Sequence, residues 1–129
     1  MNPSFIAIPP RITLSEAQSN FFAVRMKSAF PVVDVQGRLL GMITIKRLRD
    51  VDVERRQSMK VEEAMIPRED IVVMQHDRKG DEAAMRMARD GHGKVFVCDE
   101  EGRLLGLVTK TDIMSVMRER QEYEKTAAK

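Results

Sequence analysis

Thr109 and Asp112 place a hydroxyl and a carboxylate three residues apart, where an apolar segment gives way to a polar one. At the junction of a strand and a helix, the carboxylate can accept hydrogen bonds from a ligand, the threonine offers a hydroxyl, and free backbone N–H groups can face a phosphate. Alternatively, Asp112 only complements the helix dipole and Thr109 only caps the helix, as at an ordinary helix start. The two residues form a candidate ligand site.

The same spacing occurs 65 residues earlier, where Thr44 is followed by Lys46 and Arg47. A guanidinium has only donors and cannot accept hydrogen bonds as Asp112 does, but its fork fits phosphate oxygens. Lys46 and Arg47 are therefore a possible anion site. The alternative, which the sequence favours, is a solvated basic face, because residues 46–60 hold six Lys or Arg against three Asp or Glu.

The other reactive side chains match no catalytic or metal-binding pattern. The chain has two His and one Cys, and it contains neither an HExxH motif nor a recognisable Ser, His and Asp arrangement. We therefore expect no enzyme and no metal centre. His92, in the segment DGHGK, is a possible ligand contact, although a His between glycines is more often solvated.

Composition limits the class of protein. The chain has 129 residues, of which 43% are hydrophobic, and its net charge of +2 gives no reason to expect nucleic-acid binding. Cys98 lies in an apolar run, where burial is the simplest interpretation, and one thiol forms no internal disulfide. Without a long apolar segment or a recognisable signal peptide, we expect a cytoplasmic protein.

The segment GRLLG occurs twice, at residues 37–41 and 102–106, and marks an internal repeat. Aligning residues 30–51 with residues 95–116 gives nine identities in 22 positions. A duplication of this length indicates two copies of one supersecondary unit, so both copies are expected to share one core. Glycine at 37 and 102 suits a turn, whereas Gly41 and Gly106 predict close approach of a helix or a ligand to the backbone.

Each copy is predicted to contain a strand, a helix, two strands and a helix. In the first copy, Thr13 and Glu16 form a capping box that starts the first helix. The expected elements of that copy are strands 5–8, 30–34 and 39–44, the helix from 14 and a short helix 45–49. The second copy is expected to contain strands 71–74, 94–98 and 104–109, a helix at 81–90 and another from about 111. A polar linker, 51–70, is predicted to hold one helical turn ended by Pro67.

This pattern resembles a tandem pair of cystathionine-beta-synthase (CBS) domains, also called a Bateman module. The resemblance covers nearly the whole chain and depends on the segment PVVD, the segment GRLLG, and Thr followed by Asp three residues later. It implies an α/β (α+β) fold of two repeats related by a pseudo-twofold axis, at 1–58 and 59–129, each with a small mixed sheet packed against two helices. Residues 48–65 and 93–114 also resemble the CBS pair of site-two-type membrane zinc metalloproteases.

The resemblance implies a regulatory module that binds an adenosine nucleotide in the cleft between the repeats and passes the change to an attached or partner protein. AMP, ADP, ATP and S-adenosylmethionine are the implied ligands, and no cofactor is required. Asp112 would hold the ribose, with Thr109 near the ribose or phosphate. Lys94 would make backbone contacts near the base, and Ile66 and Pro67 would form an apolar wall.

An alternative is a structural module that binds no ligand and dimerises as part of a larger membrane metalloprotease. CBS pairs commonly associate through their helices, and a homodimer with Met114 and Met117 among its apolar contacts is the expected assembly. The same methionines also fit plain core packing.

Overall fold

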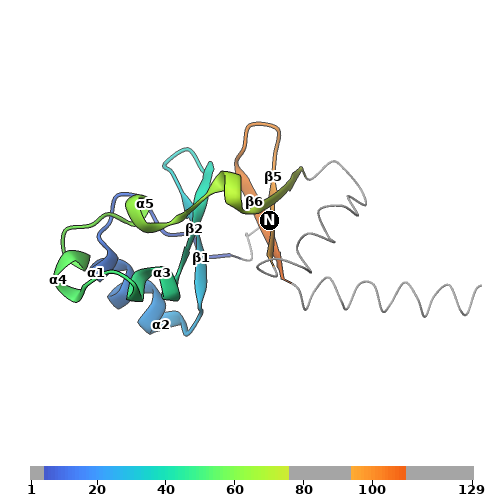
Figure 1. The fold of residues 1–129 in the computed structure, drawn as a ribbon. Helices are drawn as coiled ribbons and strands as arrows, with labels where there is room; N and C mark the ends of the chain where they lie inside the picture. Colours follow the sequence, from blue (N-terminus) through green and yellow to red (C-terminus); the bar gives the residue numbers. More distant parts are fainter. Residues whose placement is uncertain (1–4, 76–93, 110–129) are drawn as a thin grey trace, which may run out of the picture.

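Two three-stranded sheets stand side by side in the computed structural model, which describes residues 5–75 and 94–109 (Figure 1). The first sheet has the order β1-β2-β3 and the second β4-β5-β6. The strands are β1 (Ala29–Val33), β2 (Leu39–Thr44), β3 (Ile66–Pro67), β4 (Val72–Gln75), β5 (Lys94–Cys98) and β6 (Leu104–Thr109). The predicted α/β fold with two small sheets is confirmed.

The described helices are short, and α1 to α5 lie on the side of the first sheet away from the second sheet (Figure 1). They are α1 (Leu14–Ala17), the π-helix η1 (Gln18–Phe22), α2 (Ala23–Arg25), α3 (Ile45–Arg49), α4 (Val53–Arg56), α5 (Val61–Ala64) and the 3-10 helix η2 (Arg68–Asp70). The helices predicted at 81–90 and from about 111 lie outside the described residues. None of the described helices has the length and apolar character needed to cross a bilayer.

The first helical segment begins where its capping residues predict. The hydroxyl of Thr13 accepts a hydrogen bond of 3.2 Å from the backbone N–H of Glu16, which satisfies one free donor of α1. The segment does not continue as one regular helix, because η1 interrupts it before α2 ends at Met26 with a φ of 55°. Phe21 and Phe22 of η1 both pack edge-on against the ring of Phe30 in β1.

The two hairpin turns are built in the same way. The Asp34 carboxylate accepts hydrogen bonds of 2.9 Å from the backbone N–H groups of Gln36 and Arg38. Asp99 does the same in the second copy. Gly37 and Gly102 each have a φ of 84°, in the left-handed region that glycine adopts without strain. The predicted turns are therefore confirmed.

A reciprocal contact joins the two turns. The backbone N–H of Leu39 donates to the carbonyl of Gly102 at 3.0 Å, and the N–H of Leu104 donates to the carbonyl of Gly37 at 2.9 Å. These residues are equivalent in the two copies, so exchanging the copies reproduces the contact. The pair of hydrogen bonds is a local twofold relation, and it explains why GRLLG is needed twice.

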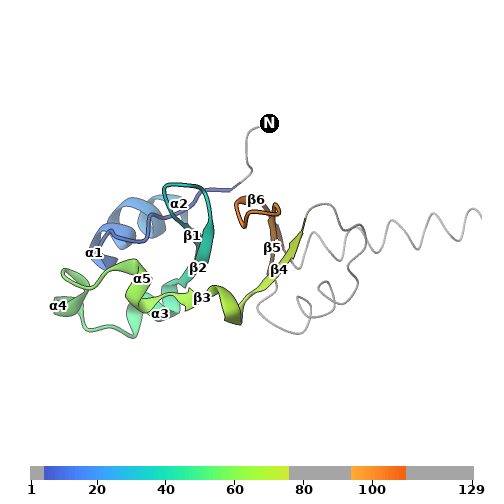
Figure 2. The ribbon, with the colours of Figure 1, turned by 90° about the horizontal axis from the view of Figure 1, so that it is seen from above.

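Buried side chains form two main layers. The helices α1 to α5 lie on one side of the first sheet, and the second sheet lies on the other side (Figure 2). One layer fills the space between the first sheet and its helices and includes Leu14, Phe22 and Leu48. The other lies between the two sheets and mixes both copies, with Leu39 and Met42 against Phe96, Cys98 and Leu104. The expected shared core is thus the layer between the sheets, and the first copy has a further core of its own beneath its helices.

The first expected strand and the linker differ from the prediction. Of residues 5–8, only Ile8 pairs in a sheet, through a single parallel bridge to Val32. The linker has its predicted turn as α5, but it also forms α4, β3 and η2. Although β3 follows the expected boundary at residue 58, it pairs with β2 of the first copy.

The close approach predicted at Gly41 is caused by β3, rather than by a helix or a ligand. A methyl group on Gly41 would overlap the backbone carbonyl oxygen of Ile66 and lie 3.0 Å from the sulfur of Met65. At Gly106 a methyl group would meet no described atom within 4 Å. The two equivalent glycines therefore stand in different surroundings in the described part of the chain.

Candidate functional site

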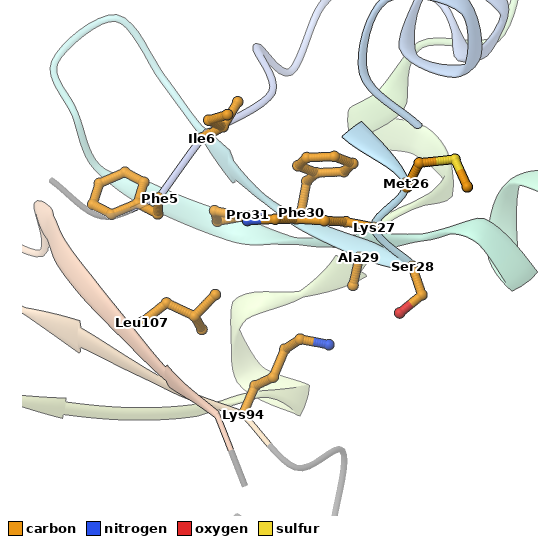
Figure 3. Close-up of a pocket in the computed structure, with 10 residues that line it drawn as sticks. All are labelled: Phe5, Ile6, Met26, Lys27, Ser28, Ala29, Phe30, Pro31, Lys94 and Leu107. Carbon is orange, nitrogen blue, oxygen red and sulfur yellow. The ribbon is translucent and has the colours of Figure 1, made fainter. Parts of the chain in front are cut away.

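An apolar cavity of about 320 Å³ lies between the two sheets. We call it the inter-sheet cavity. Lys94 and Leu107 extend into it from β5 and β6 and face Ala29 of β1, with Phe5 at one side (Figure 3). Both copies therefore line it, and Lys94, one of the residues expected at the site, is part of its wall.

The backbone of Thr109 pairs with that of Lys94, a residue of the cavity wall. In the antiparallel ladder of β5 and β6, the two residues are directly opposite each other. The backbones of Thr109 and Lys94 are thus neighbours at the end of the second sheet, and their roles as ligand contacts stay predictions. Asp112 and His92 lie outside the described residues.

A second cavity, of about 450 Å³, lies at the equivalent end of the first sheet. We call it the first-copy cavity. The residues that line it are Thr44, Lys46, Arg47, Asp50, Ile66 and Asp70. The possible anion-binding pair, Lys46 and Arg47, is therefore part of a concave site formed by β2, α3, β3 and η2.

Local hydrogen bonds fix the start of α3 at this cavity. The hydroxyl oxygen of Thr44 accepts a hydrogen bond of 3.1 Å from the backbone N–H of Arg47, and the N–H of Ile45 donates to the carbonyl of Ser28 at 2.8 Å. Leu48 anchors the helix in the core at 0% exposure. The side chains of Lys46 and Arg47 are consequently held on the exposed face, and the hydroxyl hydrogen of Thr44 is still available to a ligand.

The structure places Ile66 and Pro67 with the first copy. Ile66 pairs with Met42 and Pro67 with Gly41 in the first sheet, and Ile66 lines the first-copy cavity beside Thr44. Of the two residues expected to form an apolar wall for Asp112, Ile66 thus lines the first-copy cavity. Ile66 is only 6% exposed because it also packs between the sheets.

Sequence reasoning missed two carboxylates in the first-copy cavity, Asp50 and Asp70. Asp50 follows the end of α3, and Asp70 ends η2 in the linker. Neither belongs to a motif with a fixed spacing.

Cys98 is a packing residue in β5. It is 1% exposed, and burial raises the pKa of its thiol, although the Arg68 guanidinium acts in the opposite direction and lowers it. A thiol that stays protonated is a weak nucleophile and a weak metal ligand. The expected burial of Cys98 is confirmed.

Comparison with known proteins identifies both copies. The sequence profile of the CBS domain family matches residues 1–54 and 61–119. The relatives include inosine-5'-monophosphate dehydrogenase of Methanocaldococcus jannaschii, 31% identical over 122 residues, which cover 95% of this chain and 23% of that protein. The putative zinc metalloprotease Rip3 of Mycobacterium tuberculosis is 28% identical over 86 residues, 67% of this chain and 22% of that protein. The chain spans 20% to 35% of the length of the relatives it matches.

Solved structures share the fold. The cytosolic domain of the Mg2+ channel MgtE, in complex with ATP, is 30% identical with a TM-score of 0.71, over 90% of this chain and 46% of that chain. The CbpB protein of Listeria monocytogenes, in complex with c-di-AMP, has a TM-score of 0.74 at 21% identity, over 95% of this chain and 90% of that one. The second similarity concerns the fold alone.

Proposed function

The chain belongs to the CBS domain family as a tandem pair of repeats, and from this membership we propose that it is a regulatory module that senses an adenosine nucleotide. The ligand binds beside the second copy, at the end of β5 and β6, and its binding changes the equilibrium between two relative positions of the repeats. An attached or partner protein responds to that change. Such a linkage requires unequal affinity of the ligand for the two states.

The observation that carries this proposal is the inter-sheet cavity. A cavity of about 320 Å³ that is lined mainly by apolar side chains, with residues of both copies in its wall, suits a flat, largely apolar base. Lys94 lines the cavity and its backbone is opposite that of Thr109 in the ladder, and Asp112 follows Thr109 three residues later with a carboxylate that can accept from both ribose hydroxyls. The ATP-bound MgtE domain, at 30% identity, is a relative that holds such a ligand.

The site holds groups for binding and orienting a ligand, so we propose a module without catalytic activity. The relatives have different activities: one is a dehydrogenase and another is named as a zinc metalloprotease. A membrane metalloprotease is therefore one candidate for the regulated protein, and a cytosolic location is part of the proposal, as in the cytosolic MgtE domain.

A titration of thermal stability tests the proposal. AMP, ADP, ATP or S-adenosylmethionine at 100 times its dissociation constant should stabilise the folded protein by about 2.7 kcal/mol, because only the folded state binds it. The melting temperature should rise with one or more of them. The absence of a shift with all four ligands would favour the alternative, a structural dimerisation module.

Asp112→Ala tests the assigned site. Removing a charged acceptor from two ribose hydroxyls should weaken binding by about 1.5 to 3 kcal/mol, or roughly ten- to a hundred-fold in Kd measured by calorimetry. The control is Glu100→Ala, which removes an exposed carboxylate at the hairpin turn of the same copy. Equal losses in both variants would mean that the ribose is held elsewhere.

A further inference from the structure

Strand β6 has an unpaired outer edge in the described part of the chain. It pairs with β5 on one side, and among the described strands none lies on its other side, because the second sheet has the order β4-β5-β6. The equivalent strand of the first copy, β2, is paired on both sides, with β1 and with β3. Within the described residues, the second sheet therefore lacks an equivalent of β3.

Two residues of this outer edge differ from their equivalents in the first copy. A methyl group on Gly41 would overlap the backbone carbonyl oxygen of Ile66 in β3, whereas a methyl group on Gly106 would meet no described atom within 4 Å. Leu105 is 41% exposed, although its equivalent, Leu40, packs against the core of the first copy. Strand β6 thus has room for a neighbouring backbone, and an unpaired strand edge is a template for another strand.

The twofold relation between the copies identifies the segment that belongs at this edge. Strand β3 precedes the second copy in sequence, but it pairs with the first copy. Exchanging the two copies gives a segment that precedes the first copy and pairs with the second. The reciprocal hydrogen bonds between the two turns obey the same exchange. The equivalent of β3 is therefore expected near the beginning of the chain.

The first residues of the chain carry a matching sequence. Residues 65–67, which lead into and form β3, read Met-Ile-Pro, and residues 1–3 read Met-Asn-Pro. Pro67 precedes Val73 of β4 by six residues, and Pro3 precedes the equivalent residue, Ile8, by five. Ile8 bridges β1 in parallel, as β4 pairs with β5. A proline suits an edge position because it has no N–H group to donate to a sheet.

The start of the described chain lies within reach of β6. Phe5 packs against the layer between the sheets, which includes Leu104, and it lines the inter-sheet cavity together with Leu107 (Figure 3). Two steps of extended chain, from Phe5 to Pro3, span about 7 Å, whereas neighbouring strands lie about 4.8 Å apart. The segment that precedes Phe5 is therefore long enough to step from this layer to the outer edge of β6.

We propose that the outer edge of β6 is a docking site for residues 1–3 of the same chain, which add a short antiparallel strand to the second sheet. By equivalence with β3, Pro3 pairs with Gly106 and Asn2 with Leu107. The contact ties the beginning of the chain to the second copy, as β3 ties the linker to the first. It also covers an edge that is otherwise open to another chain. No nucleotide takes part, so the inference stands apart from the proposed function.

One position makes this contact weaker than that of β3. Ile66 is 6% exposed and packs between the sheets, and its equivalent is Asn2. A polar amide loses free energy when it is buried without hydrogen bonds, so Asn2 cannot serve as an apolar anchor. The docked segment is therefore held mainly by its backbone and detaches more readily than β3. An isoleucine at this position should strengthen the docking.

Nuclear magnetic resonance on the unmodified protein tests the placement. Nuclear Overhauser contacts should connect the protons of Pro3 with the Hα protons of Gly106. A mixture of labelled and unlabelled chains separates contacts within one chain from contacts between chains. Contacts only between chains would assign the edge to a second copy of the protein. That result, or the absence of any contact between residues 1–3 and Gly106, would overturn the inference.

Asn2→Ile tests the docking through stability. It should raise the melting temperature by roughly 3 to 6 °C, because the new side chain is buried only when the segment is docked. The control is Asn20→Ile, which places the same side chain at an exposed position of η1 and should give no such rise. In a Gly106→Ala background the gain from Asn2→Ile should disappear, because the methyl group occupies the place of the docked backbone. A gain that survives Gly106→Ala, or an equal gain from Asn20→Ile, would overturn the inference.

Discussion

The Asp99 carboxylate stabilises the hairpin turn of the second copy with both of its oxygens. One oxygen accepts from the backbone N–H groups of Glu101 and Arg103, and the other from the Arg103 guanidinium at 2.8 Å. The pKa of Asp99 lies below its ordinary value. The backbone hydrogen bond from Arg103 is the largest cause, and the hydrogen bond from the Arg103 guanidinium also lowers the pKa. The folded protein therefore favours the ionised form of this group.

Asp99→Asn should make the stability less dependent on pH. Because the pKa of Asp99 is lowered on folding, its charge stabilises the folded state above its ordinary pKa of about 3.9, and this stabilisation is lost as pH falls through the lower folded pKa. Urea denaturation should find the variant less stable at neutral pH, with a difference that shrinks below about pH 4. A difference of the same size at acidic pH would contradict this account.

The structural role of a residue was predictable where a motif fixes its distance in sequence from its partner residues. The Thr13 cap and the turn glycines at 37 and 102 have local signals, and the structure confirms them. Asp70 has no such local signal, because only the path of the linker brings it to the first-copy cavity. The roles of Thr109 and Asp112 as ligand contacts stay predictions.

At the scale of the element, strand β3 completes the first sheet with only two residues. Ile66 pairs with Met42 of β2, and the backbone of β3 passes so close to Gly41 that no side chain fits there. A glycine at this position is therefore required by packing. The sequence indicated a close approach to the backbone at Gly41 but did not identify β3 as the element involved, because a two-residue strand has no periodicity.

Gly41→Ala should destabilise the protein by about 1 to 3 kcal/mol, as overpacking in a core does, because the new methyl group displaces β3 from β2. Gly106→Ala is the matched control from the other copy, where a methyl group meets no described atom within 4 Å. Chemical denaturation of both variants gives the comparison. If Gly106→Ala lowers the free energy of unfolding as much as Gly41→Ala does, the cost arises from placing alanine in a strand at this position and not from the contact with β3.

The longer strands and α3 had clear sequence signals, in apolar runs bounded by turn residues. The π-helix η1 and the helix α4 had no such signal. Phe21 and Phe22 both reach Phe30 through η1, and this packing is a tertiary contact that local propensity does not contain. Sequence reasoning predicted one helix through this segment and missed the π form of η1.

At the scale of the whole molecule, the proposed assembly is a homodimer formed by helices of both repeats, with Met114 and Met117 among its contacts. Both residues lie outside the described part of the chain. Replacing both by Glu should shift the protein from dimer to monomer in sedimentation experiments at micromolar concentration, since charges in an apolar interface lose their hydration. Glu119→Lys, on the other side of the expected helix, should leave the dimer intact. A monomer in the unmodified protein would contradict the assembly.

The reciprocal hydrogen bonds between the two GRLLG turns bear on the origin of the molecule. Each turn gives the other the same donor and acceptor that it receives, so the contact does not depend on the linker and is equally open to two separate copies of one repeat. The tandem chain thus has the arrangement of a twofold dimer whose two subunits are joined by the linker, which raises their effective concentration. Fusion also frees the subunits to diverge in sequence. A dimer of identical chains must carry the same residue at both sites, whereas this chain carries Arg47 at one and Asp112 at the other.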